Sequence, residues 1–410
     1  MEAYLTDWFS LIVRWIHLIT GIAWIGASLH FIWLDNSLQE PPQWKKDKGI
    51  KGDNWSIHGG GIYEFNKYAL APPQWPATLH WSKWEAYSTW ISGTLLMVAV
   101  YYIQAQSYLV GPDNWISDPS VAVVASVGFL ALGLGFYELA VRSPLKHQSM
   151  VFAVLIVFYL TFLAWLSTKL FSDRAAYLHV GAVMATIMAG NVFLGIIPAQ
   201  KSFVAAVEKG NEPNADLAAF AKLRSTHNNY FTLPVLFCMI SNHYPFLYGH
   251  EYNWIILAYV MAVMAYARHF FNLRHRGIVK PSILVQAFLA FLVVAIYLGY
   301  EKMPTKMQAS ALIEGADTGV EIEAVVVNDQ RANYILAQHC VVCHSASPTY
   351  PGFSAPPAGV LMDEMENVIG SAARMKTAVA TKYMPLGNVT GMTKVERDDL
   401  LSWLDAVLKR

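Results

Sequence analysis

The 410-residue sequence has only three cysteines, few charged side chains and no excess of either charge. Charged residues make up 14% of it, whereas soluble chains average about a quarter. Three cysteines exclude a disulfide framework, and balanced charge gives no field that would attract nucleic acid as a partner. P-loop and dinucleotide-binding glycine patterns are also missing. The abundant residues are apolar, at 55% with a mean hydropathy of +0.33, which excludes a disordered chain and indicates an integral membrane protein.

The apolar residues are concentrated in eight stretches near the length of about 20 residues that crosses a bilayer. The sequence therefore predicts an all-α, polytopic bundle of about eight transmembrane helices over residues 1–302. The expected spans lie near Phe9–Leu34, Trp84–Gln104, Val121–Val141, Ser149–Phe171, Tyr177–Ile197, Tyr230–Leu247, Trp254–Phe271 and Ile283–Tyr300.

The loops between these spans differ sharply in positive charge. Alternate loops hold fifteen Lys and Arg, and the remaining loops hold only Lys169 and Arg174. Positive loops stay on the cytoplasmic side. The count predicts both termini outside and the long loop from Asp35 to Lys83 inside.

A weak internal similarity suggests a four-plus-four repeat. The run HLITGIAWIGASLHFIWL from His17 aligns with HVGAVMATIMAGNVFLGI from His179. Apolar helices match one another readily, so chance similarity is an equal alternative.

After the last span the sequence becomes polar and acidic, which predicts a linker over 303–330 and a small domain over 331–410. This domain contains Cys340-Val341-Val342-Cys343-His344, the C-x-x-C-H signal of covalent haem c attachment. Two thiols one helical turn apart can bond the haem vinyl groups, and the adjacent His can bind the iron. A redox C-x-x-C pair would not need the His, and a zinc site would need further ligands.

The second axial ligand of such a haem is expected downstream. Met384, in the run Tyr383-Met384-Pro385 before a terminal amphipathic helix, is the preferred candidate. Four other methionines compete, and core packing is the alternative role for each of them. The pattern predicts a class I cytochrome c domain. Because bacteria attach such haems on the outer face, this agrees with the loop charges.

Ionisable residues within spans are costly and often functional. With the expected topology, histidines from different helices fall in two layers. The outer layer is His17, His179 and His243, and the inner layer is His30, His80, His227 and His269. Such layers suit a non-covalent haem b with two His ligands or, less well, copper. The alternative is that each His hydrogen-bonds a neighbour and specifies packing.

The long inner loop contains the run His58-Gly59-Gly60-Gly61 among several tryptophans. A glycine run lets backbone N–H groups converge on an anion. A flexible turn beneath an interfacial aromatic belt explains it equally well.

The whole sequence resembles the membrane-bound urate oxidases, or urate hydroxylases, of bacterial purine breakdown. The similarity covers residues 14–38, 58–68 and 224–245, together with CVVCH and KYMPLGNVTGMT within 340–393. It implies an oxidoreductase, and the loop charges and the site of haem attachment together predict the bacterial inner membrane with the cytochrome domain periplasmic. It also implies oxidation of urate to 5-hydroxyisourate, with electrons passing through the fused cytochrome to a respiratory-chain acceptor.

The resemblance does not identify the urate-binding residues. Because urate is a planar anion, we expect aromatic faces with N–H donors or an Arg, and the candidates are Arg14, Arg268 and the His58–Gly61 turn. The alternative function is a membrane electron-transfer subunit that relays electrons between a partner dehydrogenase and a terminal oxidase. A transporter with a cytochrome tail ranks third.

Overall fold

The structure is a computed structural model that describes residues 2–111, 114–274, 277–300, 329–351, 353 and 355–409. The expected linker 303–330 lies outside these residues, except that Asp329 and Gln330 begin a helix. The described chain is mostly helical, as predicted.

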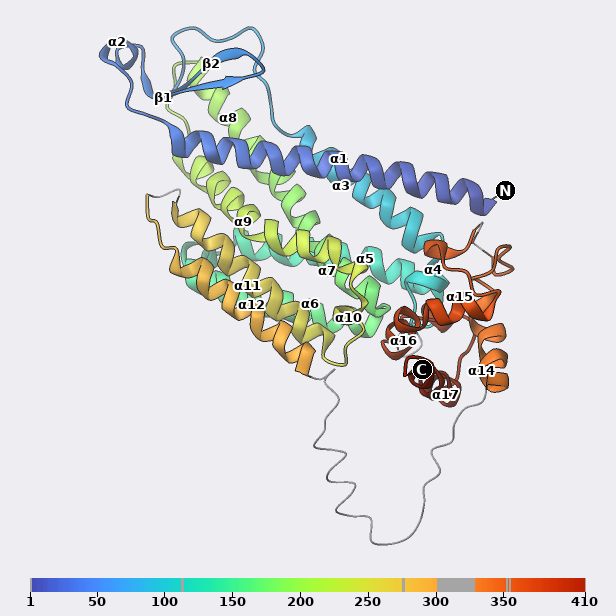
Figure 1. Cartoon of the computed structure of the whole chain (residues 1–410). Helices are drawn as coiled ribbons and strands as arrows, with labels where there is room; N and C mark the ends of the chain where they lie inside the picture. The colour runs from blue at the N-terminus through green and yellow to red at the C-terminus, as the bar shows by residue number, and fades with distance from the viewer. Residues whose placement is uncertain are drawn as a thin grey trace, which may run out of the picture.

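Long helices occur at all eight places where a span was expected (Figure 1). They are α1 (Glu2–Ser37), α3 (Trp84–Met97), α5 (Pro119–Arg142), α6 (Ser149–Leu170), α7 (Asp173–Asn191), α9 (Ala215–Ile240), α11 (Asn253–Arg274) and α12 (Ser282–Tyr300). Six helices are long and apolar enough to cross a membrane: Tyr4–Ser37, Pro119–Arg142, Ser149–Leu170, Asp173–Glu208, Asn253–Arg274 and Ser282–Tyr300.

The other two helices, α3 and α9, do not reach that standard. The α-helical part of α3 is only 14 residues long, although the π-helical turn Val98–Tyr102 continues it. Helix α9 is long enough, but its first half carries Asp216, Lys222 and Arg224. The structure therefore supports a membrane protein with six clear spanning helices.

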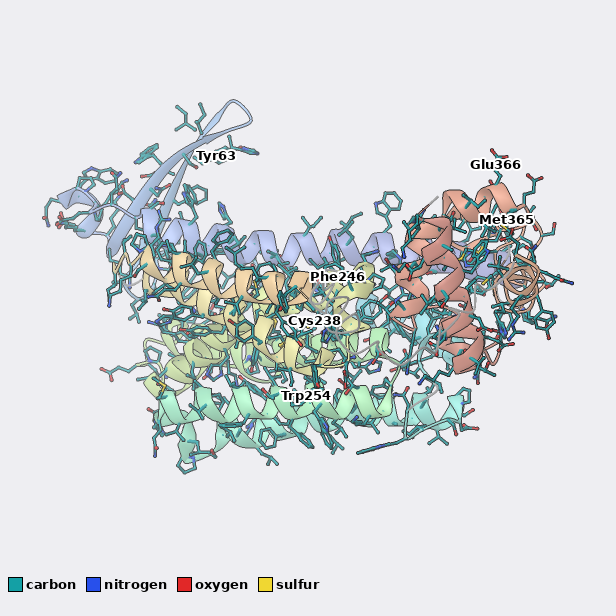
Figure 2. All side chains as sticks on the ribbon, turned by 60° about the horizontal axis from the view of Figure 1, so that its bottom comes forward. Tyr63, Cys238, Phe246, Trp254, Met365 and Glu366 are labelled. Carbon is teal, nitrogen blue, oxygen red and sulfur yellow. The ribbon has the colours of Figure 1, made fainter. Side chains whose placement is uncertain are left out.

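The long loop between α1 and α3 contains β-structure, which the all-α prediction missed. Strands β1 (Ile50–His58) and β2 (Gly61–Tyr68) form an antiparallel hairpin that projects from the bundle, as Tyr63 shows in Figure 2. Gly59 and Gly60 form its two-residue turn with φ of +56° and +80°. Two positive φ angles define the type I′ turn favoured in hairpins, so this turn requires glycine.

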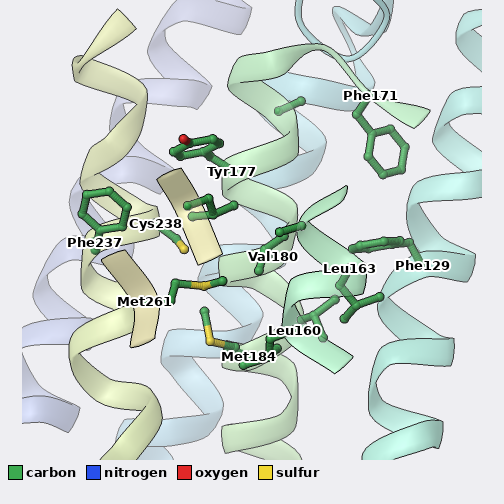
Figure 3. Close-up of a cluster of buried hydrophobic side chains, with 14 of the residues drawn as sticks. Phe129, Leu160, Leu163, Phe171, Tyr177, Val180, Met184, Phe237, Cys238 and Met261 are labelled. Carbon is green, nitrogen blue, oxygen red and sulfur yellow. The ribbon is translucent and has the colours of Figure 1, made fainter. Parts of the chain in front are cut away.

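Helix α7 is the centre of the bundle. Two thirds of its membrane-length window is buried, against 6% for α1, which lies at the edge and packs mainly on α3. The two segments that aligned as a possible repeat therefore occupy different environments. Figure 3 shows Tyr177, Val180 and Met184 of α7 among side chains from α5, α6, α9 and α11. At Gly181 an added Cβ would lie 2.5 Å from Cys238 Cβ, so α7 and α9 need this glycine to pack closely.

Short helices join the long ones at both ends of the bundle. Those at one end are α4 (Ala105–Tyr108), the 3-10 turn Ser241–His243 and α10 (Pro245–Tyr248). The hairpin end has α2 (Gln43–Lys46), the 3-10 turn Pro144–His147 and α8 (Ile197–Glu208), which continues α7 through the π-helical turn Val192–Ile196. We call the two ends the α4–α10 end and the hairpin end.

The C-terminal unit, residues 329–409, has its own hydrophobic core. Its helices are α14 (Asp329–Leu336), α15 (Met365–Gly370), α16 (Ala372–Ala380) and α17 (Lys394–Val407), with the π-helical turn Ala337–Val341 and 3-10 turns Pro357–Gly359 and Leu386–Asn388. Helix α14 packs against α17, and Trp403 Nε1 donates to Asp329 Oδ1 at 2.8 Å. The unit and the N-terminus lie at the α4–α10 end, away from the hairpin (Figure 1).

Candidate functional site

The C-x-x-C-H segment forms one helical turn in the C-terminal unit. The π-helical turn ends at Val341, and the backbone N–H of His344 donates to the Cys340 carbonyl at 2.9 Å. Both Cys340 and Cys343 are free thiols, and burial raises the pKa of Cys340 to about 12. His344 is buried, and its Nδ1 lies 3.0 Å from the Val360 carbonyl. Because a carbonyl can only accept, Nδ1 carries the proton and Nε2 presents a lone pair, as in an iron ligand.

Met384 lies in a loop that α17 holds in place. Arg397 Nη1 donates to the Met384 carbonyl at 2.7 Å and to the Val379 carbonyl at 2.8 Å, and the Met384 N–H donates to Ala378. Met384 itself is half-buried. The four competing methionines pack in or against the core of the unit: Met362, Met365, Met375 and Met392. Two thiols, a His whose Nδ1 faces a carbonyl and a Met whose backbone is held by α17 suit a haem c, with Met384 the described methionine of the unit that lies outside its core.

A polar cavity lies at the α4–α10 end, where the bundle meets the C-terminal unit. Its volume is about 110 Å³, which suits one small molecule. Two arginines, Arg14 of α1 and Arg174 of α7, line it with Asp7, Gln104, Tyr108 and, from the C-terminal unit, Phe353. The guanidinium carbon of Arg174 lies 5.1 Å from the centre of the Tyr108 ring. Arg174 Nε is buried without a hydrogen-bond partner among the described residues.

This combination of groups can hold a planar anion. Guanidinium groups donate paired hydrogen bonds to oxygens and ring nitrogens, and an aromatic face can stack on a flat ring. Arg14 was a sequence candidate for this role, whereas Arg174 was noticed only as one of two positive residues in the weakly charged loops. Its proximity to Arg14 depends on the packing of α1 against α3 and of α3 against α7.

His179 is the best-buried histidine of the predicted layers. Its Nδ1 lies 2.7 Å from the Ala175 carbonyl, its Nε2 lies 2.7 Å from Ser126 Oγ, and Phe171 stacks on its ring. Ser126 also bonds Tyr102 OH at 2.8 Å. Both ring nitrogens of His179 are thus engaged by groups of its own bundle.

A second polar network lies nearer the hairpin end. Fully buried Arg224 of α9 pairs with Glu138 of α5 and also donates to Asn191 Oδ1 at 3.0 Å. Asn191 donates to Tyr137 OH at 3.0 Å, and Tyr137 OH lies 2.7 Å from Nδ1 of His227. The network joins α5, α7 and α9. Of these residues the sequence predicted a role only for His227, in the inner histidine layer, because its partners come together only through packing.

The remaining candidates do not gather around one point. His17 bonds the Thr89 carbonyl and Ser92 Oγ, each at 3.1 Å, and His269 bonds Tyr230 OH at 2.6 Å. The exposed candidates are His30 beside Trp33, His80 beside Glu85, His243 after α9 and His58 at the hairpin turn. Buried Arg268 lies against the ring of Phe271. These side chains therefore lie in separate places and do not form one site.

No three His, Cys, Asp or Glu side chains come together as a metal site within the described residues. A haem b held by two histidines would not need such a group, so that cofactor stays a prediction. The glycine run at His58–Gly61 forms the turn of a hairpin that the sequence did not predict, and the anion site at this run stays a prediction.

Comparison with known proteins shows the family to which the membrane part of the chain belongs. No curated protein and no solved structure matches it. The urate oxidase N-terminal family matches residues 3–299, which contain every helix of the bundle and the two arginines of the polar cavity. The chain therefore belongs to the urate oxidase N-terminal family.

Proposed function

We propose that this chain is a membrane-bound urate oxidase that passes electrons from urate to a c-type haem on its own C-terminal unit. The reaction adds one water oxygen to urate and yields 5-hydroxyisourate, two protons and two electrons. The electrons pass one at a time to a one-electron acceptor of the respiratory chain. Family membership supports urate oxidation, and the C-x-x-C-H turn supports the electron route.

The observation that carries the proposal is the polar cavity at the α4–α10 end. Arg14 and Arg174 supply positive charge for the urate anion, and Tyr108 supplies an aromatic face. Gln104 adds an amide that can bond the carbonyl oxygens or ring N–H groups of a purine. Asp7, the one carboxylate among the lining residues, is placed to accept a proton as water adds.

The C-terminal unit lies directly against this cavity, since Phe353 is part of its lining. Cys340 and Cys343 would bind the haem covalently, and His344 and Met384 would bind its iron. When bound, the haem supplies a one-electron acceptor. Urate and acceptor would thus lie at the same end of the bundle.

This arrangement changes the need for further redox centres. A urate site at the hairpin end would require electrons to cross about 30 Å of hydrocarbon. A site beside the C-terminal unit removes that requirement, so the predicted haem b or copper between histidines is not needed for electron transfer. We propose instead that His179, with Ser126 and Tyr102, holds α3, α5 and α7 in register beneath the cavity.

The same arrangement supports a proposal for the cell location. We propose the bacterial inner membrane, with both termini and the C-terminal unit on the periplasmic side. The lysine-rich hairpin loop lies at the opposite end, as the positive-inside rule requires of a cytoplasmic loop.

The test uses the purified full-length chain without oxygen in ¹⁸O-labelled water. A pyridine haemochrome spectrum first counts covalent and non-covalent haem. Added urate should reduce the haem of two chains for each urate consumed, because each haem takes one of the two electrons, and the 5-hydroxyisourate formed should contain the label. Unlabelled product or a strict need for oxygen would refute the proposal. Reduction only when a partner dehydrogenase is added would instead support the electron-relay subunit.

A further inference from the structure

A glycine of the C-terminal unit lies unusually close to the helix bundle. Gly387 has φ of +57°, and a Cβ added to it would lie 2.8 Å from the Gln106 carbonyl oxygen. The same Cβ would lie 3.1 Å from the Ser107 oxygen and 3.2 Å from the Val110 oxygen. These are backbone atoms at α4, which cannot move aside as a flexible side chain can. Only glycine allows this approach.

A glycine of the bundle makes the reciprocal contact. A Cβ added to Gly249, directly after α10, would lie 2.5 Å from Thr381 Cβ and 2.8 Å from the Thr381 carbonyl oxygen. Between these two contacts the rings of Tyr383 and Tyr248 meet edge to face with centres 5.8 Å apart. Tyr383 also packs against the core of the bundle. The loop Thr381–Asn388 therefore contacts both short helices of this end.

The same loop contains Met384, and the same helix α4 contains Tyr108 of the polar cavity. On the unit side, Arg397 ties the Met384 carbonyl to α17. On the bundle side, the carbonyls of Gln106 and Ser107, which lie against Gly387, are within two residues of Tyr108 in the chain. A short, continuous path thus joins the cavity to the proposed iron ligand.

We infer that Thr381–Asn388 is the surface by which the C-terminal unit docks on α4 and α10, and that the unit accepts electrons from urate in this docked position. The inference rests on the proposed function for its electron donor. Electron tunnelling falls steeply with distance, so a unit that leaves this surface is reduced slowly. The docking surface covers the side of the C-terminal unit that contains Met384. The other sides of the unit remain accessible to the external one-electron acceptor.

The chain offers a matched control for the test. Gly391, in the same unit, also has a positive φ, of +69°, but has no atom within 4 Å of an added Cβ. Gly387→Ala and Gly391→Ala therefore introduce the same kind of backbone strain, and only the first should clash with α4. Gly249→Ala tests the contact from the bundle side, but its Cβ would also lie 2.9 Å from the Pro245 carbonyl oxygen of its own turn, so Gly387→Ala is the cleaner variant.

The first readout is hydrogen exchange of the full-length protein, which does not depend on activity. Gly387→Ala and Gly249→Ala should each speed amide exchange in peptides covering α4 and α10 by about tenfold, because undocking exposes these short helices. Gly391→Ala should exchange like the unaltered protein. Equal exchange in all three variants would overturn the docking surface.

The second readout is urate-driven reduction of the haem after rapid anaerobic mixing. Gly387→Ala and Gly249→Ala should be reduced at least about tenfold more slowly, since contact geometry limits transfer between positioned groups. Haem content, dithionite reduction and urate oxidation with ferricyanide should be retained. If urate reduced the haem at the normal rate in both Gly387→Ala and Gly249→Ala, the inference that the unit accepts electrons in the docked position would be overturned. If the unaltered protein is not reduced by urate, the proposed function fails, while the exchange result still decides the docking surface.

Discussion

Arg224 and Glu138 form a two-point ion pair inside the helix bundle, with Nη1 2.5 Å from Oε1 and Nη2 2.8 Å from Oε2. The Arg224 side chain is fully buried, and Gly195 of the π-helical turn leaves room for it. The pair joins α9 to α5 in the interior of the bundle, where an unpaired charge is very costly. It explains how α9 can pack in the bundle despite its polar first half.

Loss of one partner of this pair should destabilise the protein strongly. Arg224→Met leaves Glu138 half-satisfied in the interior, and breaking a buried pair costs about 3–5 kcal/mol. Thermal unfolding in detergent should show a clear fall in midpoint for Arg224→Met. The control is Arg142→Met, because Arg142 is the exposed second partner of Glu138. The double variant Arg224→Met with Glu138→Leu should recover much of the loss, and no recovery would contradict the ion-pair explanation.

Removal of the Arg174 guanidinium should weaken urate binding and leave the fold intact. Hydrogen bonds to charged groups contribute about 1.5–3 kcal/mol, so Arg174→Gln should raise the urate dissociation constant about 10- to 150-fold. Arg14→Gln should act in the same direction. Equilibrium binding of urate to the resting protein measures this. Arg142→Gln at the hairpin end is the control, and unchanged affinity in both cavity variants would place the urate site elsewhere.

Met384→Ala should change the haem without detaching it. The two thioether bonds to Cys340 and Cys343 remain, but loss of the sulfur ligand should remove its weak near-infrared band and lower the reduction potential. Met365→Ala is the control, since Met365 packs against the core of the unit. An unchanged spectrum in Met384→Ala would assign the ligand to another residue.

Reporter fusions should place the two ends of the bundle on opposite sides of the membrane. Alkaline phosphatase fused after Arg410 should be active because it folds in the periplasm, and fused after Lys48 it should be inactive. A fusion after Gly249, at the α4–α10 end, should behave like the one after Arg410. If only the fusion after Lys48 were active, the orientation of the protein in the membrane would be the opposite of the one proposed.

The haem content separates two accounts of the histidines that the sequence placed in two layers of the membrane part. If they hold a haem b, the purified protein should contain non-covalent haem in addition to haem c. His17→Ala or His243→Ala should then abolish urate-driven reduction of haem c while dithionite still reduces it. Covalent haem alone, with no copper, would leave His179 and its neighbours as packing or proton-transfer groups.

The sequence alone determined the helical character of the membrane part, and it predicts a haem attachment turn at C-x-x-C-H. Apolar length and a short spacing motif are local properties, and each can be recognised without knowledge of distant neighbours. The hairpin at Ile50–Tyr68 was missed because its strands lie in a polar loop and alternate weakly, so the Gly59–Gly60 turn was the main available signal.

The tertiary structure decided which polar residues meet. Arg14 and Arg174 are 160 positions apart and share a cavity only because α1, α3 and α7 pack at one end of the bundle. The histidine layers stay a prediction, and the structure adds the separate partner of each buried or half-buried histidine, since the rotation of each helix about its axis decides which neighbour a side chain reaches. Gly387 and Gly249 carried no signal of their own in the sequence. Their role depends on backbone atoms from distant segments, and only packing brings those atoms within contact distance.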